Sequence, residues 1–156
     1  EGATLGDSIA IVKTPEGHVT VFGETGKAAD EQGRAKTVMA LSLEERVQWL
    51  RDVRTIHNTA KGYWVFGVQP EAADHIAYQS CEAPAGTKVL VMTDGYYRLV
   101  SPYGRYTDEQ LIDAVVALGL GELMRELRGM ETSAADDAAI GRFKTSDDAT
   151  ALLLEV

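Results

Sequence analysis

Residues 88–92 constrain the fold of this chain most strongly, because they form an almost continuous apolar run. Such a run is typical of a buried strand. A second apolar stretch, residues 149–156, predicts a strand at the end of the sequence. Residues 9–12 form an apolar run, residues 18–22 alternate after the turn that follows it, and together they predict a β-hairpin. Strands joined in this way favour an antiparallel sheet with helices packed on one face.

Two capping boxes predict where helices begin. Ser42 with Glu45, and Thr107 with Gln110, can each satisfy backbone donors that the first helical turn leaves free. We expect the second of these helices to turn its aliphatic side chains toward the core: Leu111, Ile112, Val115, Val116 and Leu118.

Three further segments have weaker patterns. Residues 63–68 predict a short strand, with aromatic rings that belong to the core. A weak strand is expected over residues 76–81. The last helix is expected to end by Gly129, and the small and polar residues 131–146 predict a loop.

Composition limits the classes of partner. The net charge of −9 argues against a broad nucleic-acid-binding surface, which needs clustered basic side chains. Cys81 is the only cysteine, so the chain can form no internal disulfide, and this suits a reducing compartment such as the cytoplasm. No apolar run approaches the roughly 20 residues of a membrane span. We therefore expect a cytoplasmic protein without nucleic-acid or membrane partners, and its oligomeric state stays open.

Three aspartates stand beside the predicted strands. Asp7 precedes the first strand of the hairpin, Asp94 follows the strand at 88–92, and Asp147 precedes the last strand. If these strands are antiparallel neighbours, the three carboxylates meet at one end of the sheet and repel one another unless a cation lies among them. Oxygen ligands suit Mg²⁺ or Mn²⁺. Aspartate is also a common turn residue, so spacing alone leaves a structural role open.

The segments that carry these aspartates resemble motifs of the protein phosphatase 2C type, a family of metal-dependent protein serine/threonine phosphatases. Residues 5–10, LGDSIA, resemble its Gly-Asp-Ser-Arg-Ala hairpin. Residues 89–96, VLVMTDGY, resemble its strand ending in Ser-Asp-Gly, and residues 146–152, SDDATAL, resemble its terminal Asp-Asn-x-Thr strand. Residues 58–64, NTAKGYW, are similar to bacterial members. The motifs follow the family's order over nearly the whole chain.

The resemblance implies that residues 1–156 are the carboxy-terminal part of a single phosphatase domain of the α+β class. Its fold would be an αββα four-layer sandwich, with two mainly antiparallel sheets and helices outside. Asp94 and Asp147 would bind a core pair of Mg²⁺ or Mn²⁺ ions, and Asp7 would join Asp94 at a third, weaker site. The implied reaction is hydrolysis of phosphoserine or phosphothreonine in a phosphorylated protein substrate, by a metal-bound water and without a phosphoenzyme intermediate.

The sequence departs from the family pattern at two points. Arg98 stands where the family often has another aspartate, and a basic group there weakens any third metal site. The bridging Asp-Gly-x-x-Gly ligand and the rest of the family's first half do not occur. We therefore expect the remaining metal ligands upstream of Glu1, and at most weak activity from these 156 residues alone.

Arg98 and Arg105 are candidates for bidentate recognition of phosphate, with an ordinary surface role as the alternative. A rival hypothesis for the whole chain is a non-catalytic, phosphatase-like binding or regulatory module. A phosphatase acting on small phosphoesters is a third.

Overall fold

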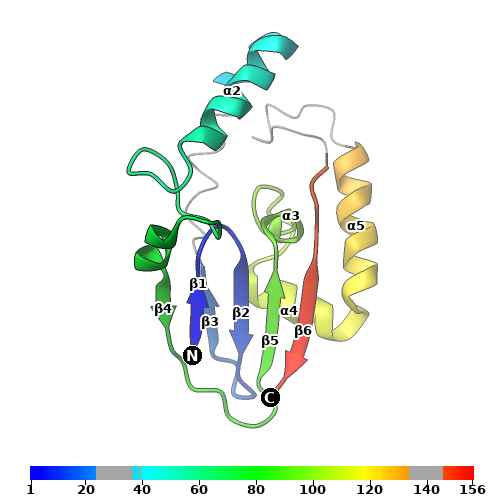
Figure 1. Ribbon diagram of the computed structural model, residues 1–156. Helices are drawn as coiled ribbons and strands as arrows, with labels where there is room; N and C mark the ends of the chain where they lie inside the picture. Colours follow the sequence, from blue (N-terminus) through cyan, green and yellow to red (C-terminus); the bar gives the residue numbers. More distant parts are fainter. Residues whose placement is uncertain (24–36, 39, 134–145) are drawn as a thin grey trace.

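The structure, a computed structural model, describes residues 1–23, 37–38, 40–133 and 146–156. Its class is α+β with antiparallel sheets, as predicted. The central sheet has the order β3-β2-β5-β6 (Figure 1). Its four strands lie where the hairpin and the two apolar runs predict them: β2 (Ile9–Lys13), β3 (Val19–Phe22), β5 (Lys88–Met92) and β6 (Ala151–Glu155).

A second, two-stranded sheet pairs β1 (Gly2–Thr4) with β4 (Ala77–Gln79) in antiparallel fashion. β4 is the weak strand that residues 76–81 predict, shortened at both ends. Gly2 packs directly against Phe22 at the end of β3, because a Cβ at Gly2 would lie 2.9 Å from the Phe22 ring. The small sheet therefore lies next to the β3 side of the central sheet.

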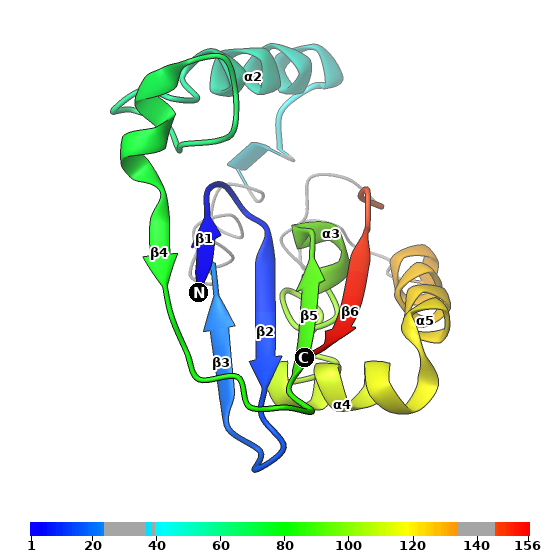
Figure 2. The same cartoon turned by 60° about the horizontal axis from the view of Figure 1, so that its bottom comes forward.

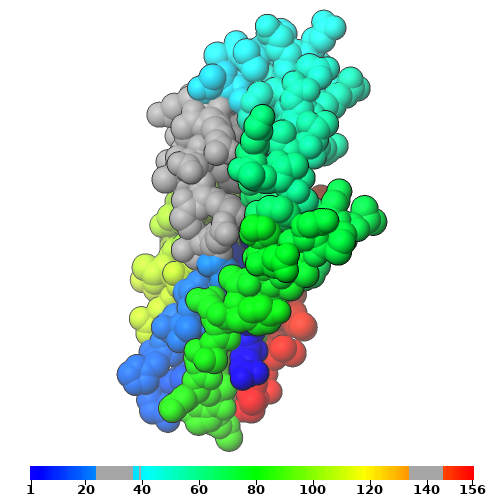
Figure 3. Space-filling view, turned by 60° about the vertical axis from the view of Figure 1, so that its left-hand side comes forward, coloured from blue at the N-terminus to red at the C-terminus, as the bar shows by residue number. Residues whose placement is uncertain are grey.

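Both capping boxes are confirmed. Ser42 caps α2 (Leu43–Thr55), and Thr107 caps α4 (Asp108–Leu118). The 3₁₀-helix η1 (Pro70–His75) leads into β4. Figure 2 shows α2 at the opposite end of the molecule from α4, and in Figure 3 the cyan surface of α2 forms that end. No residue of α2 is buried, so this helix contributes nothing to the main core.

Strand register divides the central sheet into two faces. Ile11 lies opposite Leu90, and Leu90 lies opposite Leu153, on the face that α4 and α5 (Leu120–Ser133) cover. The buried core lies between this face and the two helices. The other face carries Val12, Val91 and their neighbours, which are apolar as well. Both faces of the sheet therefore present hydrophobic side chains, but the two helices cover only one of them.

The predicted strand at residues 63–68 is wrong. Asn58 forms hydrogen bonds with the backbone of this segment instead. Its N–H donates to the carbonyl of Tyr63, and its side-chain oxygen accepts a hydrogen bond from the N–H of Val65 at 2.7 Å. These bonds form a turn rather than a ladder. Phe66 is 77% exposed, so the expectation that its ring belongs to the core is wrong too.

Two other predictions about helices need correction. Val116 and Leu118 are exposed, because α4 meets the sheet only through the narrower stripe of Leu111, Ile112 and Val115. The last helix, α5, does not end by Gly129 but continues to Ser133. A glycine inside a helix costs only about 1 kcal/mol, and the packing of α5 on the core offsets this.

Tyr96 gives the core a measurable dependence on pH. Its ring is fully buried, and its hydroxyl donates to the carbonyl of Leu120 at 3.0 Å. Burial, with a smaller contribution from Tyr106, raises the pKa of Tyr96 to about 12. The folded state therefore holds this proton more tightly than the unfolded state, and stability falls as the pH rises from about 10 toward 12.

We expect Tyr96→Phe to reduce the alkaline loss of stability, part of which remains because the pKa values of Tyr97 and Tyr106 are raised as well. The variant is also expected to lower the free energy of unfolding at neutral pH by about 1 kcal/mol, through the lost hydrogen bond. Urea denaturation at several pH values between 7 and about 11.5 measures both effects. Tyr78→Phe is the control, because Tyr78 is exposed. Equal alkaline slopes for the wild type and Tyr96→Phe would contradict the assignment.

Candidate functional site

The central sheet brings the three predicted aspartates to one end of its strands. Ile9 pairs with Met92, and Met92 pairs with Ala151. Asp7 precedes β2, which begins at Ile9. Asp94 follows β5, which ends at Met92, and Asp147 precedes β6, which begins at Ala151. We call this end of the sheet, with Asp7, Asp94 and Asp147, the carboxylate end. The expectation that the three positions share one end of the sheet is confirmed.

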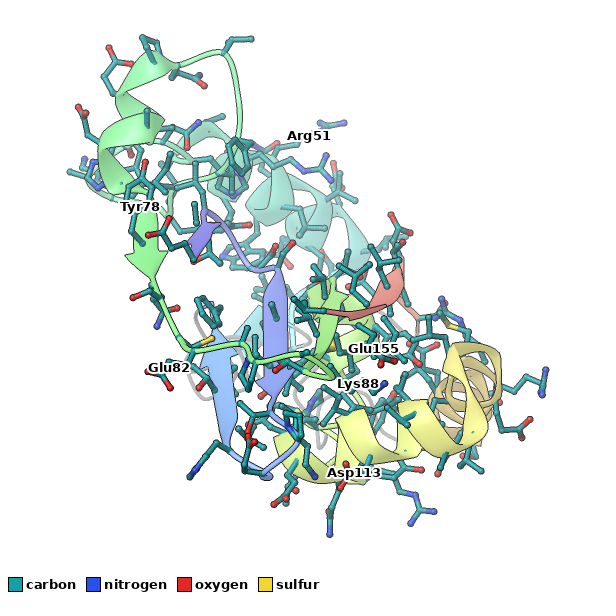
Figure 4. All side chains as sticks on the ribbon, turned by 90° about the horizontal axis from the view of Figure 1, so that it is seen from below. Arg51, Tyr78, Glu82, Lys88, Asp113 and Glu155 are labelled. Atoms are coloured by element: carbon teal, nitrogen blue, oxygen red, sulfur yellow. The ribbon has the colours of Figure 1, made fainter. Side chains whose placement is uncertain are left out.

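The opposite end of the strands has a different chemistry. There Lys88 forms an ion pair with Glu155, and both side chains are visible in Figure 4. Lys13 binds Asp113 of α4 at 2.7 Å, with Glu109 nearby at 3.1 Å. The carboxylates of Glu109, Asp113 and Glu155 at this end are thus paired with lysines, whereas the carboxylate end brings three aspartates together.

Close backbone packing holds Asp94 and Asp147 together. The N–H of Thr93 donates to the carbonyl of Thr150, and the N–H of Thr150 donates to the Thr93 hydroxyl, both at 3.0 Å. Gly95 is the second residue of the short helix α3 (Asp94–Tyr97), and a Cβ at this position would lie 2.0 Å from the carbonyl oxygen of Asp148. Only glycine lets the segment before β6 approach Asp94 so closely.

The three carboxylates influence one another electrostatically. Although Asp94 keeps an exposed surface, packing around its carboxyl raises the pKa of Asp94, and the charges of Asp7 and Asp147 raise it further. The N–H of Gly95, which donates to Asp94 at 2.8 Å, and the charge of Arg98 act in the opposite direction. A cation at this end of the sheet would relieve the repulsion.

Arg98 supplies one positive charge to the carboxylate end. It follows α3 directly, and its backbone N–H donates to the carbonyl of Asp94. One guanidinium nitrogen donates to Asp147 and the other to Glu131 of α5, both at 3.2 Å. Glu131 also accepts a hydrogen bond from Arg128 at 2.6 Å. Arg98 therefore joins α5 to the segment that carries Asp147.

Glu131 is the residue of this network that sequence reasoning missed. The expected end of the helix at Gly129 placed residue 131 in a loop, where a glutamate has no particular partner. One signal was available: Glu131 follows Leu127 by four residues, and positions spaced in this way share one face of a helix. Leu127 and Glu131 are both buried.

Arg105, the second candidate for phosphate binding, lies in a different environment. Its Nε donates to Glu126 of α5 at 2.5 Å, and its guanidinium lies 5.4 Å from the centre of the Tyr106 ring. The Tyr106 hydroxyl donates to the other oxygen of Glu126 at 2.6 Å. These contacts join the loop before α4 to α5. The binding of phosphate by Arg98 or Arg105 stays a prediction.

The carboxylate end fits a divalent cation in its chemistry but not in its complete geometry. Carboxylate oxygens are the ligands that Mg²⁺ and Mn²⁺ prefer. Within the residues that the structure describes, however, no three acidic, histidine or cysteine side chains converge closely enough to hold a metal ion. The hydrogen bond from Arg98 engages one of the three carboxylates, that of Asp147.

No protein-family model, curated protein or solved structure matches this chain. The resemblance to phosphatases therefore stays a prediction from the sequence motifs. Throughout the described ranges, each helix is too short or too polar to cross a membrane.

Proposed function

We propose that this chain is part of a phosphatase of the protein phosphatase 2C type, which hydrolyses phosphoserine and phosphothreonine in proteins with the help of Mg²⁺ or Mn²⁺. One observation carries the proposal: Asp7, Asp94 and Asp147 belong to three motifs that are far apart in the sequence, and all three lie at the carboxylate end. A turn or cap role for each aspartate separately gives no reason for them to meet.

The face of the central sheet away from α4 and α5 supports the finer proposal of a four-layer sandwich, because its β5–β6 part is exposed while Val12 and Phe22 on it are buried. Leu152 on this face is 53% exposed, and Val91 and Leu154 are also exposed. A largely apolar hollow of about 560 Å³ lies over the face, lined by Gly2, Phe22 and other residues of both sheets. Two sheets pack face to face through such apolar surfaces. A second sheet on this face would bury it, with α4 and α5 outside the first sheet.

In the proposed reaction, Asp94 and Asp147 would supply carboxylate oxygens to a core metal pair, and Asp7 would add a third carboxylate beside Asp94. Bound divalent cations supply Lewis-acid chemistry, which polarises the phosphoryl group and activates water. The close contact at Gly95 and the hydrogen bond between Thr93 and Thr150 bring the backbone that carries Asp147 next to Asp94. The proposal also requires oxygen ligands that the described residues do not supply.

The test is Mn²⁺-dependent hydrolysis of a phosphoserine peptide by the full natural protein. We expect Asp94→Asn and Asp147→Asn each to lower kcat/KM by at least about 100-fold, since even outer-shell partners of a metal contribute roughly 10–100-fold. Asp113→Asn is the matched control, because it removes the same charge at the opposite end of the strands. Unchanged rates for both site variants would show that the metal assignment is wrong.

A second candidate is a non-catalytic module that binds a phosphoprotein or another partner without turnover. The ion pair between Arg98 and Asp147 favours it, because this pair engages a carboxylate that catalysis needs. Binding of a phosphopeptide at micromolar affinity, with no release of phosphate in Mn²⁺, would support the module over the enzyme.

A further inference from the structure

Arg98 is placed differently from an ordinary surface arginine. Its side chain is 11% exposed and forms ion pairs with Glu131, which is 1% exposed, and with Asp147, which is 15% exposed. Both oxygens of Asp147 accept a hydrogen bond, one from Arg98 and the other from the N–H of Asp148 at 2.9 Å. The carboxylate is thus already neutralised by a group of the protein itself.

The two carboxylates that bind Arg98 are not equivalent. Glu131 is almost inaccessible and is held a second time by Arg128, so it is fixed within α5. Asp147 lies outside any helix or strand, at the more accessible end of the network. If Asp147 moves away, Arg98 keeps Glu131 as a partner and is not left as an unpaired buried charge. Exchange at Asp147 therefore avoids the large penalty of stranding a buried cation.

We propose that Arg98 is an internal counter-ion of the carboxylate end: it holds Asp147 while no metal is bound, and a divalent cation must displace it to bind Asp147. Arg98 is then a positioning residue that sets the metal affinity of the site. The inference rests on the proposed function in one respect, that Asp147 is a metal ligand.

The charge of Arg98 opposes metal binding directly. A unit positive charge within several ångströms of a divalent cation changes the affinity by about tenfold, even in a largely aqueous environment. The same charge also occupies an oxygen that the cation needs. Removal of the charge, with hydrogen-bonding groups retained, is therefore expected to strengthen the binding of a divalent cation.

The experiment titrates Mn²⁺ alone into the 156-residue chain and follows free Mn²⁺ by electron paramagnetic resonance. Relative to the wild type, we expect Arg98→Gln to bind Mn²⁺ about tenfold more tightly. Arg125→Gln is the control, because it causes the same change in net charge and breaks a surface ion pair. Arg125 pairs with Glu122, and its side chain is 73% exposed. We expect its affinity to stay within about twofold of the wild type.

The double variant Arg98→Gln with Asp147→Asn is expected to lose the gain in Mn²⁺ affinity. That loss would assign the gain to the carboxylate of Asp147. Unchanged or weaker Mn²⁺ binding by folded Arg98→Gln overturns the inference, and so does a failure of both proteins to bind. Tighter binding supports it even if the full natural protein shows no phosphatase activity. That result would reject the proposed reaction while leaving the role of Arg98 intact.

A second measurement needs no variant and stays informative if Arg98→Gln does not fold. Nitrogen-edited NMR of the wild type resolves the Nε–Hε group of Arg98. We expect added Mg²⁺ to shift this resonance as Asp147 exchanges its partner, and the Arg125 resonance to stay in place. A purely structural ion pair would not respond to Mg²⁺, so an unmoved Arg98 resonance at saturating Mg²⁺ overturns the inference.

Discussion

Replacing Gly95 with alanine is expected to lower the free energy of unfolding by at least about 3 kcal/mol, the upper end of what overpacking usually does. The new Cβ would lie 2.0 Å from the carbonyl oxygen of Asp148 and 3.2 Å from the Cβ of Asp147. Neither backbone can withdraw without breaking the hydrogen bonds between Thr93 and Thr150 that join β5 to β6. Urea denaturation measures the loss.

Gly129→Ala provides the matched control for this prediction. Gly129 is also helical, but no atom lies within 4 Å of the Cβ it would gain. Alanine there is expected to stabilise the protein by up to about 1 kcal/mol, because it favours the helix without a clash. The same substitution is thus expected to have opposite signs at two glycines. If Gly95→Ala is as stable as Gly129→Ala, the segment before β6 does not pack on Asp94 as described.

The parts of the fold that sequence predicted well depend on local patterns. Ser42 and Thr107 each bind groups only three residues away, so their capping boxes are complete within the sequence itself. The strand at residues 88–92 is marked by its continuous apolar run. In contrast, β1 pairs with β4, which lies far away in the chain, and no local pattern in either short segment predicts this pairing.

The segment at residues 63–68 shows how a local pattern can mislead. Its aromatic residues are typical of strands, but Asn58 with a φ of 55° turns the chain and binds the backbone of Tyr63 and Val65. A side chain that competes for backbone groups in this way overrides strand propensity.

In the candidate site, too, some features follow from local sequence patterns and others depend on tertiary contacts. The meeting of the three aspartates could be predicted because a residue next to a strand end has a position fixed by strand pairing. The partners of Arg98 could not, since they depend on how α5 packs against the sheet. Gly129 signalled a helix end, and only the tertiary contacts of Leu127 and Glu131 carry the helix past it. In the sequence, the residue that holds Arg98 in place was therefore marked only by its four-residue spacing from Leu127.

Glu131→Ala is expected to lower the free energy of unfolding by about 3–5 kcal/mol, as is usual when one member of a buried ion pair is removed. Among the described residues, the variant would leave Arg98 with Asp147 as its carboxylate partner, and Arg128 would lose its bond to Glu131 as well. Glu122→Ala on the same helix breaks the exposed pair with Arg125 and is expected to change stability by no more than about 0.5 kcal/mol. Urea denaturation of both variants gives the comparison.

A double variant, Arg98→Met with Glu131→Leu, separates the two possible origins of that loss. If the loss comes from an uncompensated buried charge, removing both charges is expected to recover most of the stability, because apolar side chains can replace a buried pair at little cost. If the double variant is as unstable as Glu131→Ala, packing of the Glu131 side chain is responsible instead. Equal stability of Glu131→Ala and Glu122→Ala would contradict the anchored position of Arg98, and Asp147 would then lack the fixed counter-ion that the carboxylate end needs.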